Sequence, residues 1–160
     1  MPHVTQELVA KAYGALATGD KEKIRQYWAD ELVWQVPGHN QVSGWKFTLD
    51  EFIAFMAKVG NLSAGSFNMQ TITIMVNDEY SCDITNNKGH RAGDDNKKLD
   101  IDVAHVLRWR DGKVIGGRGA IMGDGTARYD DFWTGSTDAA SRGTRESVKK
   151  AVAQWGGVTS

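Results

Sequence analysis

A strictly alternating segment followed by a tight turn constrains the fold of this chain most. One histidine and four apolar residues occupy every second position, at Ile101, Val103, His105, Leu107 and Trp109. A period of two places all five side chains on one face of a β-strand. Asp111-Gly112 then predicts a tight turn into a second strand, from Lys113 to about Met122.

His105 is the one polar residue on that face, and its surroundings decide between a functional and a structural role for it. A neutral imidazole both donates and accepts protons and titrates near neutral pH. If the face lines a cavity, His105 is the group around which chemistry is expected. If the face lines a sealed core, His105 is a buried histidine that bonds a backbone carbonyl or a water.

Helix and strand signals along the rest of the chain indicate an α+β protein. Three helices are predicted, over residues 4–18, over a short segment capped by Asp20 that holds Ile24 and Trp28, and over residues 48–59, which begin with a capping-box sequence. Strands are predicted over residues 32–36, 71–76 and 80–85, and residues 86–98 are expected to be a polar hairpin connection with its tip near 93–96.

The end of the chain differs in character. Residues 134–143 predict a polar linker, and Val148, Val152 and Trp155 lie on one face of a helix predicted over residues 145–155. We therefore expect one domain over residues 1–133, followed by a C-terminal linker and short helix over residues 134–160.

Composition excludes several classes of function. The net charge of −1 comes without a basic cluster, so neither a nucleic acid nor an anionic membrane is an expected partner. No apolar stretch approaches the length of a membrane span, and the N-terminus lacks a secretory signal. The single cysteine, Cys82, fits a reducing, cytoplasmic setting. The four histidines lack metal-ligand spacing, so no metal is expected.

Three segments together carry a family resemblance: AYGALATGDKEKIRQYWADELVWQVPG, SGWKFTLDEFIAFM and AHVLRWRDGKV. In this order they resemble the SnoaL-like and ketosteroid-isomerase-like branch of the nuclear-transport-factor-2-like superfamily, over roughly residues 4–133. The resemblance implies a cone-shaped, curved antiparallel sheet packed against three N-terminal helices, with a deep apolar pocket between them. It also implies a homodimer, no cofactor, and acid–base chemistry on a hydrophobic cyclic substrate.

The residues that the resemblance implies for catalysis are mostly replaced here. The helix-1 tyrosine of similar isomerases corresponds to Ala12, and their general base corresponds to Val36. His105 matches a histidine of SnoaL-like cyclases, but their acidic residue on the last strand falls on Gly119, and a polar residue two before the histidine falls on Val103. A pocket with few polar groups is therefore expected.

Two further residues are candidates for proton transfer. His39 lies in the loop after the first strand, which rims the pocket in this family, although an exposed loop histidine is the simpler interpretation. Asp124 follows the last strand and replaces the missing acid only if the flanking glycines fold it inward; the alternative is a turn aspartate. The expected substrate-binding residues are Trp34, Trp45, Val36, Val103, Tyr13 and Phe55.

The sequence thus predicts a cofactor-independent acid–base enzyme, of the isomerase, cyclase or lyase type, with a small hydrophobic cyclic substrate. The alternative is a non-catalytic small-molecule-binding or accessory protein with the same fold. The lost acids at Val36 and Gly119 favour the alternative, and the matched histidine at His105 favours the enzyme.

Overall fold

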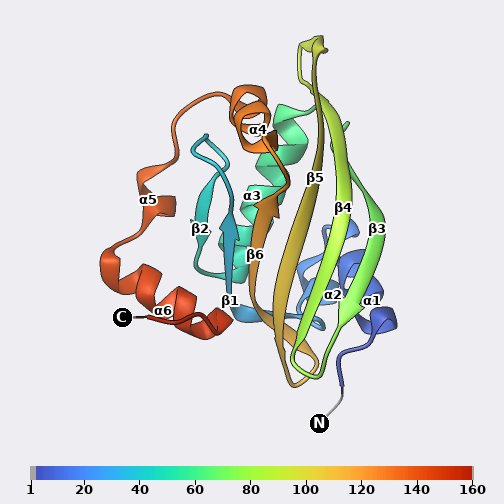
Figure 1. The fold of residues 1–160 in the computed structure, drawn as a ribbon, viewed down its shortest axis with the longest axis vertical. Coiled ribbons are helices and arrows are strands. Elements are labelled where there is room, and N and C mark those ends of the chain that lie inside the picture. Colours follow the sequence, from blue (N-terminus) through green and yellow to red (C-terminus); the bar gives the residue numbers. More distant parts are fainter. Residues whose placement is uncertain (1–2, 160) are drawn as a thin grey trace.

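The strand that contains His105 lies inside a six-stranded curved sheet (Figure 1). The computed structural model describes residues 3–159. Strand β5 (Asp94–Arg110) pairs on one side with β4 (Tyr80–Arg91) and on the other with β6 (Lys113–Ile121). The Asp111-Gly112 turn joins β5 to β6, as the sequence predicts.

The sheet has the order β2-β1-β6-β5-β4-β3. Its remaining strands are β1 (Trp28–Val36), β2 (Gly44–Lys46) and β3 (Asn68–Val76). β1 runs parallel to β6, whereas the other pairings are antiparallel, so the sheet is mixed where a purely antiparallel one was expected.

The polar hairpin predicted over residues 86–98 is present, but most of it is paired strand and its turn lies just before the predicted tip at 93–96. β4 and β5 stay paired to a turn at Ala92-Gly93 and project beyond the body of the molecule (Figure 1). Polar residues occupy both faces of this ribbon because its outer part has no apolar layer to pack on, so the sequence lacks the alternation that marks a half-buried strand.

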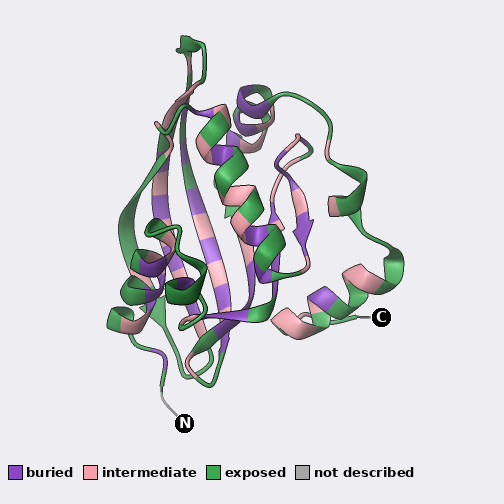
Figure 2. Ribbon diagram, turned by 180° about the vertical axis from the view of Figure 1, so that it is seen from behind, coloured by how far each residue is buried: buried purple, intermediate pink, exposed green. Residues whose placement is uncertain are grey.

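Three helices cover the inner face of the sheet, as Figure 2 shows from behind. They are α1 (Gln6–Ala17), α2 (Lys21–Ile24) and α3 (Leu49–Leu62). Asp20 caps α2, but this helix stops at Ile24, so Trp28 opens β1 and is not helical as predicted. Thr48 caps α3, while Glu51 accepts a hydrogen bond from the Phe47 amide at 2.6 Å.

Three more helices follow β6 in the described residues, whereas the sequence predicts only one helix after the sheet. α4 (Gly125–Trp133), which the sequence analysis did not predict, lies at one end of the sheet (Figure 1). α5 (Ala139–Arg142) is a single turn, and α6 (Arg145–Trp155) has the predicted bounds. No helix within residues 3–159 is long and apolar enough to cross a membrane.

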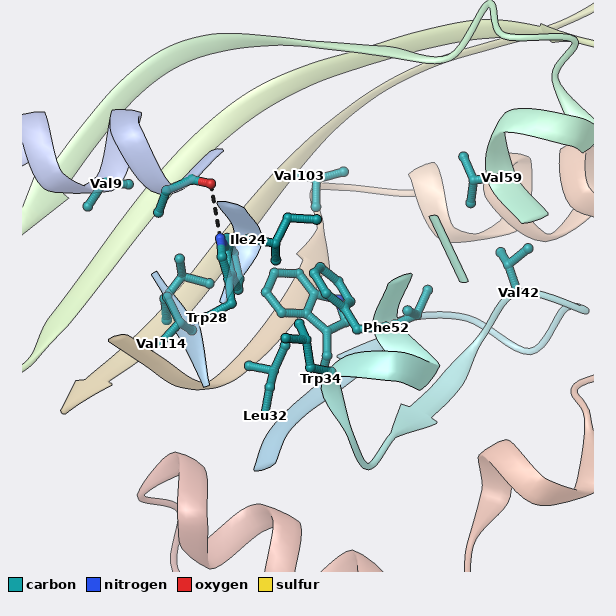
Figure 3. Close-up of a cluster of buried hydrophobic side chains, with 14 of the residues drawn as sticks. Val9, Ile24, Trp28, Leu32, Trp34, Val42, Phe52, Val59, Val103 and Val114 are labelled. Atoms are coloured by element: carbon teal, nitrogen blue, oxygen red, sulfur yellow. Dashed lines mark hydrogen bonds between the residues drawn. The ribbon is translucent and has the colours of Figure 1, made fainter. Parts of the chain in front are cut away.

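Aromatic side chains join α3 to β1 in the core (Figure 3). Phe52 stacks on Trp28 with ring centroids 5.5 Å apart and lies 4.8 Å from the Trp34 ring. The Trp28 indole donates a hydrogen bond to the Ala12 carbonyl at 3.0 Å, which ties α1 to the same cluster. A cavity opens beside this cluster, and Trp34 and Phe52 form part of its wall.

Candidate functional site

A cavity of about 460 Å³ lies between the inner face of the sheet and α1, α3 and α4. Its volume falls within the range of small-molecule sites. Most of its wall is apolar or aromatic, including Trp34, Val36, Phe52, Phe55, Phe67 and Val103. His105 contributes to this wall, so its strand face lines a cavity and not a sealed core.

Strand β4 adds a row of polar side chains to this apolar enclosure. Ser81, Asp83, Thr85 and Asn87 alternate along its inner face, and each is at most 4% exposed. Buried polar groups require hydrogen-bond partners, and Ser81 has one in the Trp109 indole at 2.9 Å. The remaining three side chains line the cavity.

Asp83 binds two side chains from different elements. Its Oδ2 lies 2.9 Å from Nδ1 of His105, directly across the β4–β5 ladder. Its Oδ1 accepts a hydrogen bond from the Tyr13 hydroxyl of α1 at 2.5 Å. Both carboxylate oxygens are therefore occupied, and Tyr13, Asp83 and His105 form one connected network at the cavity wall.

The surroundings of Tyr13 keep its hydroxyl protonated. Burial, and then the charge and hydrogen bond of Asp83, raise the pKa of Tyr13 well above 10.0, so the hydroxyl remains a donor at physiological pH. An ionised carboxylate only accepts hydrogen bonds, so with Asp83 in this form a neutral imidazole bonded to it holds its proton on Nδ1 and keeps a lone pair on Nε2. Nε2 has no hydrogen-bond partner among the described residues.

Trp34 completes the setting of His105. The two rings lie 5.9 Å apart between centroids, and the Trp34 indole lies close to β6 at Gly117. A Cβ at Gly117 would meet the Trp34 ring at 2.3 Å, so glycine at this position allows the indole to lie there.

The structure brings five of the six expected substrate-binding residues to one cavity with His105. They are Trp34, Val36, Val103, Tyr13 and Phe55. Gly119 pairs with His105 on the neighbouring strand, and Pro37 lies where its side chain would begin. As expected, Asp100 and Asp102 lie away from His105 at the surface, bridged by the Asn86 amide.

Three predicted site residues lie elsewhere. Trp45 pairs with Gln35, one residue out of phase with Trp34, so it lies on the outer face and packs against Ala151 of α6. His39 lines a separate hollow with Trp45, and its backbone amide donates to Asp130. Asp124 is exposed and forms an ion pair with Arg128 at 3.4 Å, which corresponds to the turn aspartate of the alternative interpretation.

Asp83 is the site residue that sequence reasoning missed. The segment Ser81 to Thr85 alternates polar and apolar residues, and such a pattern normally turns its polar side to solvent. The pairing of Asp83 with His105 could not be counted from the hairpin turn, because an irregularity between His90 and Arg91 shifts the β4–β5 register. Within the described residues, no group of three or more His, Cys, Asp or Glu side chains is placed to hold a metal ion.

Comparison with known proteins gives the same family that the sequence resembles. The profile of the SnoaL-like domain matches residues 9–116. Bal32a, from a soil-derived mobile gene cassette, has a TM-score of 0.71 at 24% identity, over 79% of this chain and 94% of that one. A nuclear-transport-factor-2-like protein from Burkholderia xenovorans has a TM-score of 0.67 at 18% identity, over 79% and 98%.

TerC, crystallised with polyporic acid, is a further structural neighbour, with a TM-score of 0.62 at 16% identity over 79% of this chain and 95% of TerC. At these identities the likeness shows a shared fold. No curated protein matches the sequence.

Proposed function

The chain belongs to the SnoaL-like domain family, and from this premise we propose that it is a cofactor-independent acid–base enzyme. The substrate is a small hydrophobic cyclic molecule, and the reaction is an isomerisation, a cyclisation or a related elimination. One observation carries the proposal: His105 lines an apolar cavity and its Nδ1 is held by a buried carboxylate at 2.9 Å. A neighbour of the same fold, TerC, was crystallised with polyporic acid, which supports a small organic ligand.

His105 acts first as a base in this proposal. Nε2 takes a proton from a substrate carbon next to a carbonyl, and the electron pair of the C–H bond moves onto the carbonyl oxygen as an enolate. Asp83 stabilises the imidazolium that forms, as a carboxylate does when it orients a histidine base. The apolar wall excludes water, so the paired charges attract more strongly than in solvent.

The imidazolium then acts as an acid and restores the starting enzyme. It returns the proton to a different carbon in an isomerisation, to a new alkoxide in a cyclisation, or to a departing hydroxyl, which leaves as water, in an elimination. Each route begins and ends with neutral His105, and a positioned acid–base group typically contributes about 10²–10⁴-fold in rate.

A non-catalytic small-molecule-binding protein is the second candidate. Besides Asp83, no carboxylate among the described residues lines the cavity, and Gly119 and Val36 occupy positions where similar enzymes carry acids. His105 would then serve as a hydrogen-bonding group for a retained ligand.

A base-promoted ring opening separates the two candidates. In 5-nitrobenzisoxazole a base removes one C–H proton, the N–O bond breaks, and a coloured phenolate forms. We expect the wild type to accelerate this reaction. His105→Asn should lower the rate about 10²-fold or more, because the amide nitrogen can still bind Asp83 but offers no base.

His39→Asn is the matched control, because His39 lies outside this cavity. It should leave the rate unchanged. Equal rates for wild type and His105→Asn would contradict the enzyme proposal. A copurifying ligand found by native mass spectrometry, bound without turnover, would then support the binding protein.

Assembly and location belong to the same proposal. We propose a homodimer, formed through the outer face of the sheet, and a cytoplasmic location, for which the support is the single free cysteine, Cys82.

A further inference from the structure

The end of the cavity away from His105 holds hydrogen-bond donors that have no partner. The Asn87 side chain is 4% exposed, and its Oδ1 accepts from the Thr85 hydroxyl at 2.6 Å. Its amide nitrogen bonds to none of the described residues. Trp133 is fully buried, and its indole nitrogen is the one such buried side-chain atom without a partner in residues 3–159.

Helix α4 lies beside the part of the cavity that Asn87 lines. Asn87 pairs with Ile101, and Ile101 meets the start of α4 at Gly125. Tyr129 and Trp133 lie one helical turn apart on α4, and both line the cavity, as Asn87 does. Burial raises the pKa of the Tyr129 hydroxyl above its usual value near 10, so this group also stays protonated and can donate.

The two polar ends are well separated. Asp83 and Asn87 lie four residues apart on one face of β4, which corresponds to about 13 Å along a strand. Apolar walls, including Val103 and Ile121, lie between them. A ligand that reaches both ends must therefore be elongated and hydrophobic in its middle.

The polar groups at the α4 end of the cavity, on Asn87, Tyr129 and Trp133, favour an uncharged hydrogen-bond acceptor on the ligand. Asn87 Nδ2, the Tyr129 hydroxyl and the Trp133 indole are donors, while the Asn87 oxygen is already used by Thr85. No Lys or Arg side chain among the described residues lines the cavity, so a carboxylate would be buried there without a counter-charge. A ketone or quinone oxygen needs only hydrogen bonds.

We propose that Asn87 and Tyr129 form a second binding station that holds a neutral carbonyl oxygen of the ligand. The ligand is then an elongated ring molecule with an oxygen function at each end, one held at Asn87 and the other placed at His105. The assignment of the reacting end rests on the proposed function, whereas the carbonyl station rests on the α4 end alone. Trp133 contributes the third donor when the ligand is bound.

Two fluorescent probes of nearly equal size test the station. 6-Acetyl-2-naphthol carries a hydroxyl at one end and a ketone at the other, and 6-ethyl-2-naphthol lacks the ketone. We expect the wild type to bind the acetyl probe about three- to tenfold more tightly, the usual effect of one neutral hydrogen bond. Titration of the probe fluorescence measures both dissociation constants.

Two variants and a matched control locate the effect. Asn87→Leu and Tyr129→Phe should each reduce the preference for the ketone and leave the ethyl probe's affinity within about twofold. Asn86→Leu is the control, since Asn86 lies next to Asn87 but on the outer face of β4. It should keep the full preference.

An absent ketone preference in the wild type would overturn the station, as would a preference that survives both variants. His105→Asn separates this result from the proposed function. If that variant keeps the ketone preference, the station stands whether or not ring opening depends on His105.

Discussion

Asp83 receives a hydrogen bond on each oxygen, and this double role sets the state of both partners. Tyr13 donates from α1 and His105 donates from β5, so three elements meet at one carboxylate. The carboxylate both orients the imidazole and stabilises it when charged. Burial of a carboxylate is costly unless it is fully hydrogen-bonded, and here the two donors supply that compensation.

Asp83→Asn should remove the carboxylate charge beside His105 and change the tautomer of the imidazole. The amide nitrogen can donate to Nδ1 of His105, which favours the tautomer with the proton on Nε2, so the atom facing substrate no longer carries a free lone pair. We expect the 5-nitrobenzisoxazole rate to fall about 10–10³-fold, with binding of 6-ethyl-2-naphthol within threefold of wild type. Unchanged ring opening would show that the carboxylate does not orient the base.

The raised pKa of the Tyr13 hydroxyl should be visible in how the free energy of unfolding of Tyr13→Phe, compared with wild type, depends on pH. In the folded protein Tyr13 keeps its proton above pH 10, while in the unfolded chain it loses it near 10.0. Its contribution is therefore complete below about pH 10 and is lost as the pH rises further. The variant should be about 1–3 kcal/mol less stable at pH 8, since one carboxylate oxygen loses its partner.

Urea unfolding of both proteins at pH 8 and at several values above pH 10 measures this difference in the free energy of unfolding. The difference between wild type and Tyr13→Phe should shrink at the higher values. Tyr27→Phe, a variant in the turn before β1, is the control for the substitution itself. A difference that stays constant with pH would contradict the raised pKa.

The sequence revealed His105 but not its partner, for a physical reason. His105 interrupts an otherwise apolar row, which is visible in one strand alone. Asp83 belongs to a row of polar residues, and its burial depends on the register between two strands and on a helix that brings Tyr13 above it. Trp45 was misplaced because its pairing with Gln35 puts it on the face opposite to Trp34. His39 lies in the loop between β1 and β2, where strand alternation gives no orientation.

At the scale of elements, local signals explain which segments were predicted. α6 carries its own cap at Thr144, an apolar face and a left-handed Gly156 at its end, so its bounds follow from the sequence. α4 was missed because Asp124 makes no side-chain cap bond and the helix starts at a glycine. Contact with Ile101 and Ile121 stabilises it, and such contacts are not visible in a single segment.

Deletion of residues 144–160 should destabilise the fold, because α6 covers the outer face of β1 and β6. Trp155 lies against Gly116, and its indole donates to the Val106 carbonyl at 3.0 Å. Trp155 is half-buried, so Trp155→Ala alone should cost about 2–3 kcal/mol, less than the loss of a core tryptophan, and lower the melting temperature by about 4–12 °C. Calorimetry measures both variants.

Val158→Ala serves as the control, since Val158 is 98% exposed beyond the helix. It should melt as the wild type does. A truncated protein with unchanged melting temperature, oligomeric state and probe affinity would show that α6 does not stabilise the sheet.

At the scale of the whole molecule, α6 divides the outer face of the sheet into two parts. The part over β1 and β6 is covered by Trp155 and Ala151. The C-terminal end of α6 also reaches Tyr80 of β4 and Arg108 of β5. The rest of the outer face, over β3, β4 and β5, includes Met75, which is 49% exposed. Ile84 and Val106 are half-buried on the same face. A dimer through the sheet must therefore use this second part.

Ile84→Arg should convert the proposed dimer to a monomer. The side chain lies on the outer face opposite Thr73 and Ala104, so an arginine there would be buried without a counter-charge between two copies. Because Asp83 and Thr85 face the other way, probe binding in the cavity should stay within twofold of wild type. Analytical ultracentrifugation at several concentrations gives the mass, and Val158→Arg, with the same charge on the exposed tail, should remain dimeric. A wild type that sediments as a monomer at every concentration would contradict the dimer, and it would leave the cavity and its network of Tyr13, Asp83 and His105 complete within one chain.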